Sequence, residues 1–224
     1  MSVKIINLKI KLRIIPPAFM IIVGLLSTSL NTNAQAGASA TTQKAKLKTA
    51  NWQPDAGFEK LFDGTTLQGW CYRNKEGEIT EKFNGKKVSS DGRYTAAKGI
   101  LTVNYPLGVE RKIQESWTIR EFPGNFILKL EFRASPNADS GIFLRGPQLQ
   151  CRDYTVAGPY KDLKNYRPQD WNTIVVTVKN NIAHCECNGE VLEDALELPA
   201  SGAIGLEGDH GQMEYRHIQI KKLP

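Results

Sequence analysis

The chain has 224 residues and a formal net charge of +6 at pH 7. Residues 1–36 hold four cations and no acid, and residues 37–48 hold three lysines and no acid, which leaves a net charge of −1 for residues 49–224. The basic excess therefore belongs to the start of the chain. This distribution argues against a nucleic-acid-binding domain, which carries its basic residues on the folded surface.

Residues 1–36 have the pattern of a secretory signal peptide. The apolar run Ile14 to Leu26 is shorter than the roughly 20 residues of a membrane span. It is followed by the small-x-small cleavage site Ala34-Gln35-Ala36 and preceded by a positive segment of Lys4, Lys9, Lys11 and Arg13. We expect a periplasmic or secreted protein, cleaved near Ala36, with no membrane span after processing.

The remainder of the chain divides into a short spacer and one domain. Residues 37–48 are small, polar and basic without periodicity, which predicts a disordered spacer. Residues 49–224 are enough for a single domain with a substantial core. We therefore expect one folded domain over residues 49–224.

The four cysteines do not have the spacing of a disulfide-stapled scaffold or of a zinc site. Cys185 and Cys187 lie two apart in an extended run, so they share one face of a strand and cannot easily bridge each other, while His184 points to the opposite face. We predict that the cysteines, which include Cys71 and Cys151, are buried thiols that pack as small apolar residues.

Ten short runs of alternating residues predict an antiparallel β-sandwich without a long helix. The pair Asn188-Gly189 predicts a tight hairpin turn, and Asp63-Gly64 predicts another turn. The predicted strands are 99–103, 113–119, 126–133, 141–145, 148–152, 171–179, 182–187, 190–193, 203–207 and 213–221.

The stretch from Asp139 to Asp153 carries the densest set of candidate binding residues. Two extended runs flank Gly146-Pro147, and alternation places Phe143 and Arg145 on one face and Ile142 and Leu144 on the other. An aromatic ring beside guanidinium, amide and carboxylate groups can hold a polyhydroxylated ring. A solvated sheet face with a structural Arg–Asp pair is the alternative. The second run adds Gln148, Gln150, Arg152 and Asp153.

Three further segments could contribute to the same surface. Glu131 and Arg133 lie on the polar face of the run 126–133, and antiparallel pairing of that run with 141–145 would bring them near Phe143 and Arg145. The loop 154–168, which begins with Tyr154, could wall a sugar site or simply connect two strands. His210 lies between glycines in the loop Gly208 to Gly211, where a ligand could reach it.

Five sequence runs in order resemble the 3-keto-disaccharide hydrolase domain family. They are GFEKLFDGTTLQGW (57–70), SGIFLRG (140–146), DWN (170–172), NGEVL (188–192) and GAIGLEGDHGQMEYRHIQIKKL (202–223). The resemblance implies an exported bacterial protein with a concanavalin-like jelly-roll fold. The chain departs from the family pattern at Glu207, where Gln is common, and at His217, where Asn is common.

The resemblance implies a substrate that is a disaccharide or related glycoside oxidised at C3 of one sugar. A ketone at C3 makes the C2 proton acidic, so that a base can remove it while the glycosidic oxygen leaves C1 with help from an acid; water then adds back. Asp153, Glu207 and His210 are the candidate acids and bases, and their roles remain unassigned. Arg145 and Arg216 are expected to bind the enolate and hydroxyl groups.

We expect Arg145, Gln150, Asp153, His210 and Arg216 to share one pocket. The expected substrate-binding set is Glu131, Arg133, Phe143, Arg145, Gln150, Tyr154 and Arg216. The expected partner is an oligosaccharide or oxidised disaccharide. No cofactor or metal is expected, although a divalent cation is left open.

Two other functions compete with this one. A direct glycosidase would need the strand pattern E-x-D-x-x-E of retaining jelly-roll glucanases, which is absent from the sequence. A non-catalytic glycan-binding module remains possible because the same fold hosts lectins. Such a module would depend on exposed aromatic residues such as Trp117, Tyr154, Tyr160 and Tyr166 rather than on the acids.

Overall fold

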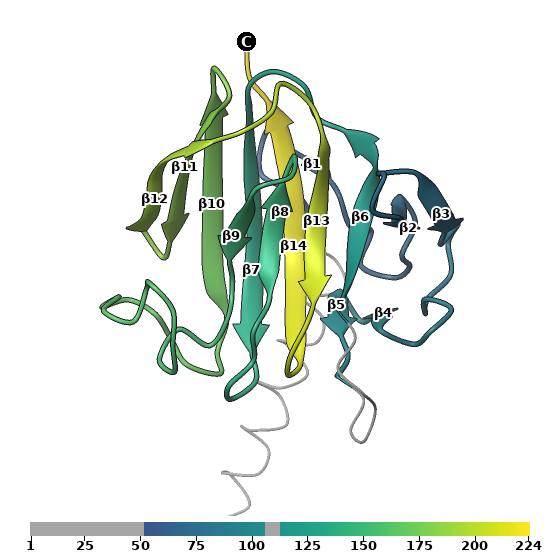
Figure 1. Cartoon of the computed structure of the whole chain (residues 1–224), viewed down its shortest axis with the longest axis horizontal. Coiled ribbons are helices and arrows are strands. Elements are labelled where there is room, and N and C mark those ends of the chain that lie inside the picture. The colour runs from purple at the N-terminus through teal and green to yellow at the C-terminus, as the bar shows by residue number, and fades with distance from the viewer. Residues whose placement is uncertain (1–51, 106–112) are drawn as a thin grey trace, which may run out of the picture. The chain divides into compact units, whose positions relative to one another are not determined.

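The computed structural model describes residues 52–105 and 113–224, whose backbone forms two antiparallel β-sheets packed face to face (Figure 1). The eight-stranded sheet has the order β12-β11-β10-β7-β14-β5-β4, with β1 beside β14. Its strands are β1 (Glu59–Lys60), β4 (Tyr94–Ala97), β5 (Ile100–Val103), β7 (Phe126–Ala134), β10 (Asn172–Lys179), β11 (Ile182–Cys187), β12 (Glu190–Glu197) and β14 (Met213–Lys222).

The six-stranded sheet lies in front of the other sheet in Figure 1 and has the order β3-β2-β6-β13-β8-β9. Its strands are β2 (Trp70–Arg73), β3 (Ile79–Lys82), β6 (Gln114–Glu121), β8 (Gly141–Leu144), β9 (Gln148–Gln150) and β13 (Ala203–Gly208). From β5 to β8, successive strands alternate between the two sheets. This antiparallel jelly-roll sandwich is the fold class that the sequence predicts.

The core lies between the sheets because each strand turns one apolar face inward. In β7, Phe126, Leu128, Leu130 and Phe132 are buried, whereas the residues between them are half-buried on the outer face. The alternation of a half-buried strand, two residues per repeat, thus produces a sheet with one apolar and one polar face.

The structure confirms all ten predicted strands to within a few residues. Asn188 and Gly189, with φ angles of 49° and 83°, form the predicted hairpin turn between β11 and β12. The short strands β1 to β4 were not predicted. In β2 three successive residues, Trp70, Cys71 and Tyr72, are buried, so the sequence there has no polar–apolar alternation.

All four cysteines are free and buried, as predicted. Cys185 and Cys187 face the core from β11, and burial raises the pKa of each thiol to about 12. They pack as small apolar residues.

The predicted signal peptide (1–36), the predicted spacer (37–48) and the first three residues of the predicted domain lie outside the described residues. Within residues 52–105 and 113–224 there is no helix that could cross a membrane.

Candidate functional site

Two aromatic rings lie side by side on the outer face of the six-stranded sheet. Trp117 of β6 and Phe143 of β8 both pair with Gly205 of the intervening strand β13, so the three residues form one row across the sheet. The ring centroids are 5.0 Å apart and the ring planes differ by 32°. We call these three residues the aromatic row.

Gly205 is required for this arrangement. A Cβ atom at Gly205 would lie 2.8 Å from Cε3 of Trp117 and 3.1 Å from Cβ of Phe143. The first of these distances is well inside van der Waals contact, so any side chain here would push the indole off the sheet. The missing side chain therefore lets Trp117 lie flat over β13.

The next row of the same face is acidic. Glu115 and Glu207 lie two residues beyond Trp117 and Gly205 on their strands and pair across β6 and β13. Burial, followed by the charges of Asp209 and Glu115, raises the pKa of Glu207 to about 7. We call Glu115 and Glu207 the acidic row. A carboxyl group with this pKa exchanges protons near neutral pH, which suits an acid or base in catalysis.

Gln148 holds the Glu207 carboxylate in place. Its Nε2 donates a hydrogen bond of 2.7 Å to Oε2 of Glu207. The Gln148 side chain crosses Gly141, where a Cβ atom would lie 2.0 Å from Nε2. Gly141 is therefore the second glycine on this face, after Gly205, whose missing side chain makes room for a neighbour, here the side chain of Gln148.

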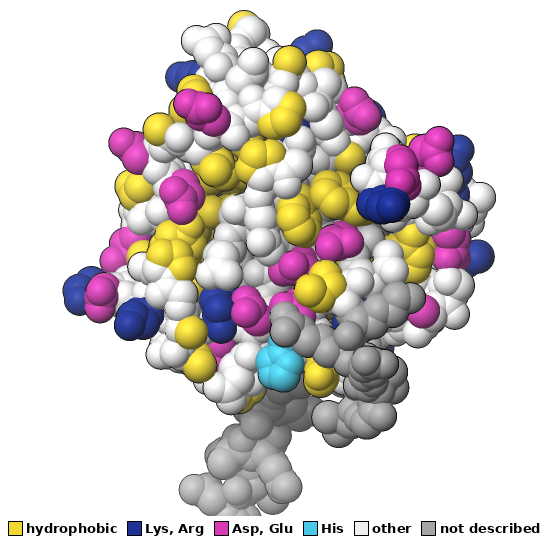
Figure 2. All heavy atoms as spheres, in the orientation of Figure 1, with side chains coloured by type: hydrophobic (Ala, Val, Ile, Leu, Met, Phe, Trp, Pro, Cys, Tyr) yellow, Lys and Arg dark blue, Asp and Glu magenta, His cyan; other side chains and the backbone are white. Residues whose placement is uncertain are grey.

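His210 is exposed on the loop that follows β13, beside the acidic row. Its backbone N–H and C=O exchange hydrogen bonds with those of Asp139, at 3.1 and 2.7 Å. The charge of Asp139 also acts on Glu207. The ring of Tyr105 meets the imidazole edge to face, with centroids 5.0 Å apart. Figure 2 shows this face, with acidic side chains gathered near its centre and a histidine beside them.

Arg152 brings a positive charge to the same end of the face. Its Nη1 lies 3.1 Å from Oδ2 of Asp139, in an ion pair that is mostly shielded from solvent. Because the backbone of Asp139 is also hydrogen-bonded to that of His210, Asp139 holds Arg152 and His210 at the same end of the face.

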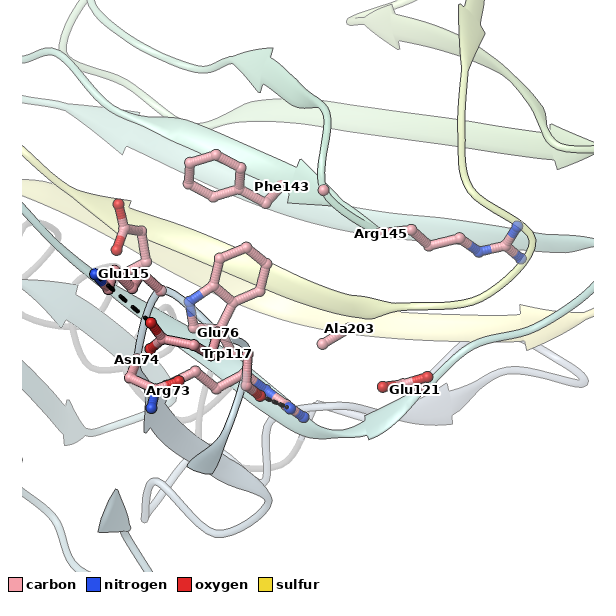
Figure 3. A pocket seen from close by; sticks show the side chains of 12 residues that line it. Arg73, Asn74, Glu76, Glu115, Trp117, Glu121, Phe143, Arg145 and Ala203 are labelled. Carbon is pink, nitrogen blue, oxygen red and sulfur yellow. Dashed lines mark hydrogen bonds and ion pairs between the residues drawn. The ribbon is translucent and has the colours of Figure 1, made fainter. Parts of the chain in front are cut away.

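A hollow of about 700 Å³ opens beside the two rows (Figure 3). Glu115, Trp117 and Phe143 line it from the sheet, and the turn after β2 closes one side. Glu207 lies next to this hollow, directly across the strands from Glu115. The turn residues that line the hollow are Asn74, Lys75, Glu76 and Gly77.

The structure brings together four of the residues predicted from the sequence, on the outer face of the six-stranded sheet. Phe143 and Glu207 lie in the two rows, and His210 lies beside them. Gln150 pairs with Gly141 at the edge of the sheet, where the loop at Gly158 approaches its side chain closely. The expectation of a single pocket that also holds Asp153 and Arg216 is wrong. Arg145 does line the hollow together with Phe143, but its guanidinium points away from Phe143.

Glu131, Arg133 and Arg216 lie on the outer face of the other sheet. β7 pairs with β10 and β14 and does not pair with β8, so the expected contact of Glu131 and Arg133 with Phe143 and Arg145 is wrong. Nε of Arg216 donates to Glu131, and the guanidinium groups of Arg133 and Arg216 lie 4.8 and 4.0 Å from the ring centroid of Trp171. His217 is stacked on Trp52 on the same outer face.

Arg145 is buried and bound to the protein itself. It is 5% exposed, and its guanidinium donates to the carbonyl oxygens of Phe122 and Pro199, at 2.6 and 2.9 Å, and to that of Gly124. Figure 3 shows its side chain pointing away from Phe143. The alternation that predicted a shared face fails because Arg145 has a φ angle of 57°, in the turn after β8.

Asp153 and Tyr154 are buried as well. Asp153 is 2% exposed and accepts hydrogen bonds from the backbone N–H of Asn137 and from side chains of the loop that follows it. Tyr154 is 1% exposed and packs against Phe132 and Tyr166. Both residues fasten the loop 154–168 to the core, which accounts for their residue types without a ligand.

Several residues of the site were not among the predicted site residues. The sequence analysis named Trp117 only as an exposed aromatic residue of a glycan-binding module. Its place in the site could not be predicted because its neighbours Gly205 and Phe143 are remote in sequence. Within the described residues, no three His, Cys, Asp or Glu side chains are grouped so that they could hold a metal ion. Gln148 and Arg152 were placed on the candidate face by alternation but were not included in the expected substrate-binding set. The residues that sequence reasoning missed are Glu115, Asp139 and Asp209.

A β-sandwich with aromatic and acidic side chains on one outer face is an architecture of carbohydrate-binding and carbohydrate-cleaving proteins. The chain belongs to the family of proteins with a 3-keto-alpha-glucoside-1,2-lyase-like domain, whose model matches residues 57–221.

Two solved structures from Parabacteroides distasonis ATCC 8503, each described as a "putative glycosyl hydrolase", share the fold. The first is 16% identical with a TM-score of 0.57 and covers 78% of this chain and 99% of its own. The second is 21% identical with a TM-score of 0.52 and covers 74% of this chain and 99% of its own. No curated protein matches the sequence.

Proposed function

We propose that the protein is an exported enzyme that cleaves glycosides carrying a ketone at C3 of the sugar. The observation that carries the proposal is Glu207, a half-buried carboxyl group with a pKa raised to about 7, between an aromatic row and an exposed histidine. Membership in the family with a 3-keto-alpha-glucoside-1,2-lyase-like domain supports this substrate class. The signal-peptide pattern of residues 1–36 supports export.

The proposed reaction is an elimination followed by hydration. A base removes the proton from C2, and the electron pair moves into the C2–C3 bond to form an enolate on the C3 oxygen. The enolate then forms a C1–C2 double bond, the C1–O bond breaks, and an acid gives a proton to the departing oxygen. Addition of water across the double bond yields the free 3-keto sugar and returns a proton to C2.

Glu207 and His210 are the proposed acid–base pair. A group with a pKa of about 7 is present in both protonation states at neutral pH, so Glu207 can accept the C2 proton or donate one to the leaving oxygen. His210 is exposed on the adjacent loop and can take the complementary role. Arg152, held by Asp139 at the same end of the face, is the proposed cation for the enolate in place of Arg145 and Arg216.

The test uses methyl 3-keto-α-glucoside and purified protein, with release of methanol as the readout. The wild-type protein should release methanol, and Glu207→Gln and His210→Ala should each lower the rate by about 100-fold or more. Asp194→Asn is the control, since Asp194 is an exposed residue of β12 that contacts His184. Binding of the sugar without methanol release would contradict the proposal and favour a glycan-binding module.

A further inference from the structure

We infer, on the basis of the proposed function, that two core tyrosines, Tyr94 and Tyr215, are positioning residues for the acid–base reaction. They belong to β4 and β14 of the eight-stranded sheet, yet their hydroxyl groups reach across the core toward β13 of the other sheet. Their role is to fix the stretch of backbone that carries Glu207. Both are 0% exposed, so they act through the backbone and not by contact with a substrate.

The hydroxyl group of Tyr94 joins the two strands that carry the acidic row. It lies 2.6 Å from the carbonyl oxygen of Gln114 and 2.7 Å from that of Leu206, and it accepts a hydrogen bond of 3.1 Å from the backbone N–H of Ser116. Gln114 and Ser116 flank the acidic residue of β6, and Leu206 directly precedes that of β13. One phenol therefore fixes the backbone beside both members of the acidic row.

Gly208 leaves the space that this hydroxyl group needs. A Cβ atom at Gly208 would lie 3.0 Å from the hydroxyl oxygen of Tyr94 and 2.8 Å from the carbonyl oxygen of Gln114. Because 2.8 Å is too short for a contact between a side-chain carbon and a backbone oxygen, β13 would have to shift away from β6. The glycine that follows Glu207 therefore allows the phenol to reach both strands.

Tyr215 acts on the next carbonyl group along β13, through Ser140. Oγ of Ser140 donates a hydrogen bond of 2.7 Å to the carbonyl oxygen of Glu207, and the hydroxyl oxygen of Tyr215 lies 3.1 Å from the same Oγ. A serine hydroxyl has one hydrogen, so Tyr215 is the donor to Ser140. The neighbouring residue Asp139 exchanges backbone hydrogen bonds with His210. The segment that holds Glu207 thus also holds the loop of the exposed histidine.

Packing alone does not account for the two hydroxyl groups, because a phenylalanine ring would fill the same space without a polar atom to satisfy. Burial raises the pKa of Tyr94 and of Tyr215 well above its usual value, so each phenol keeps its proton and remains a donor. A polar network whose members are all paired holds a core in one arrangement. An acid–base group requires such a fixed support, since its reach to the reacting proton is set by geometry.

Removal of the hydroxyl groups alone tests the inference. In Tyr94→Phe and in Tyr215→Phe, the loosened β13 should expose the Glu207 carboxyl group to more solvent. Its pKa should therefore fall from about 7 to about 6 in an NMR titration of the carboxyl carbon. With methyl 3-keto-α-glucoside, kcat should fall about ten-fold while KM stays unchanged.

Tyr72→Phe is the matched control. Tyr72 is also buried, and it donates a hydrogen bond of 2.7 Å to Asp91, so this variant loses a core hydroxyl group without releasing β13. The pKa of Glu207 and kcat should both keep their wild-type values. If Tyr94→Phe and Tyr215→Phe leave the pKa of Glu207 as unchanged as Tyr72→Phe does, the inference is overturned and the phenols serve stability alone.

The contact through Ser140 gives a second test. Ser140→Ala should lower the pKa of Glu207 at least as much as Tyr215→Phe does, and the double variant should show no further decrease, because Tyr215 acts on Glu207 through Ser140. Tyr94→Phe contacts a different carbonyl group, so its effect should add to that of Ser140→Ala. Additive shifts from Ser140→Ala and Tyr215→Phe would contradict the inferred path.

The NMR titration needs no turnover, which separates this inference from the proposed function. If the pKa of Glu207 falls in both tyrosine variants but the wild-type protein cleaves no keto sugar, the positioning of Glu207 stands and the proposed function fails. If the wild-type protein cleaves the keto sugar and neither variant changes the pKa of Glu207, the proposed function stands and this inference fails.

Discussion

Gln148 donates a hydrogen bond of 2.7 Å from Nε2 to Oε2 of Glu207, across a strand position that glycine keeps open. The hydrogen bond stabilises the charged form of the carboxyl group and lowers its pKa, whereas burial and the neighbouring acids raise it. The pKa of about 7 is therefore the result of opposing effects, and Gln148 limits the rise.

Replacing Gln148 should raise the pKa of Glu207 further. Gln148→Leu removes the hydrogen bond, and Gln148→Glu adds a second negative charge, so the second variant should give the larger shift. The pH dependence of cleavage, or an NMR titration of the Glu207 carboxyl carbon, would measure both shifts. An unchanged or lower pKa in Gln148→Leu would contradict the assigned contact.

Glu207 should make the stability of the protein depend on pH. Because folding raises its pKa from 4.5 to about 7, the folded state binds this proton more tightly than the unfolded state does. Its contribution to stability is fully present below pH 4.5 and is lost as the pH rises through about 7.

The Glu207→Gln variant lacks this titration. Between pH 4.5 and pH 8, its free energy of unfolding should increase by about 1 kcal/mol relative to that of the wild type. This amount is reduced for solvent screening, because Glu207 is only half-buried. Urea unfolding at the two pH values would measure the difference. A difference, taken as the variant's free energy of unfolding minus that of the wild type, that stays constant or decreases as the pH rises would refute the raised pKa.

Two glycines with similar backbone angles should differ in their tolerance of alanine. Gly211 and Gly77 have φ angles of 73° and 85°, so alanine at either position costs about 1 kcal/mol of backbone strain. At Gly211 the new Cβ would also lie 2.7 Å from Cα of Ala138, whereas nothing lies within 4 Å at Gly77.

Gly211→Ala should therefore lower the free energy of unfolding by about 3 kcal/mol, against about 1 kcal/mol for Gly77→Ala. Because Gly211 follows His210 directly, its substitution should also lower the cleavage rate. Chemical denaturation of both variants checks the prediction, and equal costs would show that the loop has room to move.

Arg145 should matter for stability rather than for substrate binding. Arg145→Met removes the donors to the carbonyl oxygens of Phe122, Gly124 and Pro199 and leaves buried acceptors unpaired. We expect a loss of about 3 kcal/mol in the free energy of unfolding. KM of the folded variant should be unchanged; a clear rise in KM at full stability would restore Arg145 to the substrate-binding set.

Alternation along single strands was sufficient to predict which side chains share a face. It correctly turned Ile142 and Leu144 toward the core and Phe143 toward the outer face. It also predicted the bounds of β11 without error. These predictions succeeded because a strand that covers a core repeats every two residues.

Alternation does not tell which sheet a strand joins. β7 and β8 are neighbours in sequence but belong to different sheets, so Glu131 and Phe143 lie on opposite outer faces. Likewise, the row of Trp117, Gly205 and Phe143 depends on pairing between strands remote in sequence, which no local pattern encodes.

Polar residue types were also ambiguous near the ends of strands. Asp153 and Arg145 have the chemistry of a sugar site, yet both are buried and bonded to the protein's own loops. Fastening irregular backbone requires the same donors and acceptors as binding hydroxyl groups. Only burial and hydrogen-bond partners distinguish the two uses.

The central claim is that this face removes the C2 proton of a 3-keto-glycoside. Cleavage of methyl 3-keto-α-glucoside in D₂O, followed by NMR, tests it directly, with the free product incubated alone to correct for spontaneous exchange. Elimination and hydration must place solvent deuterium at C2 of the released sugar, and Glu207→Gln should suppress its formation. Release of a sugar that retains its original C2 hydrogen, or undiminished release by Glu207→Gln, would contradict the account.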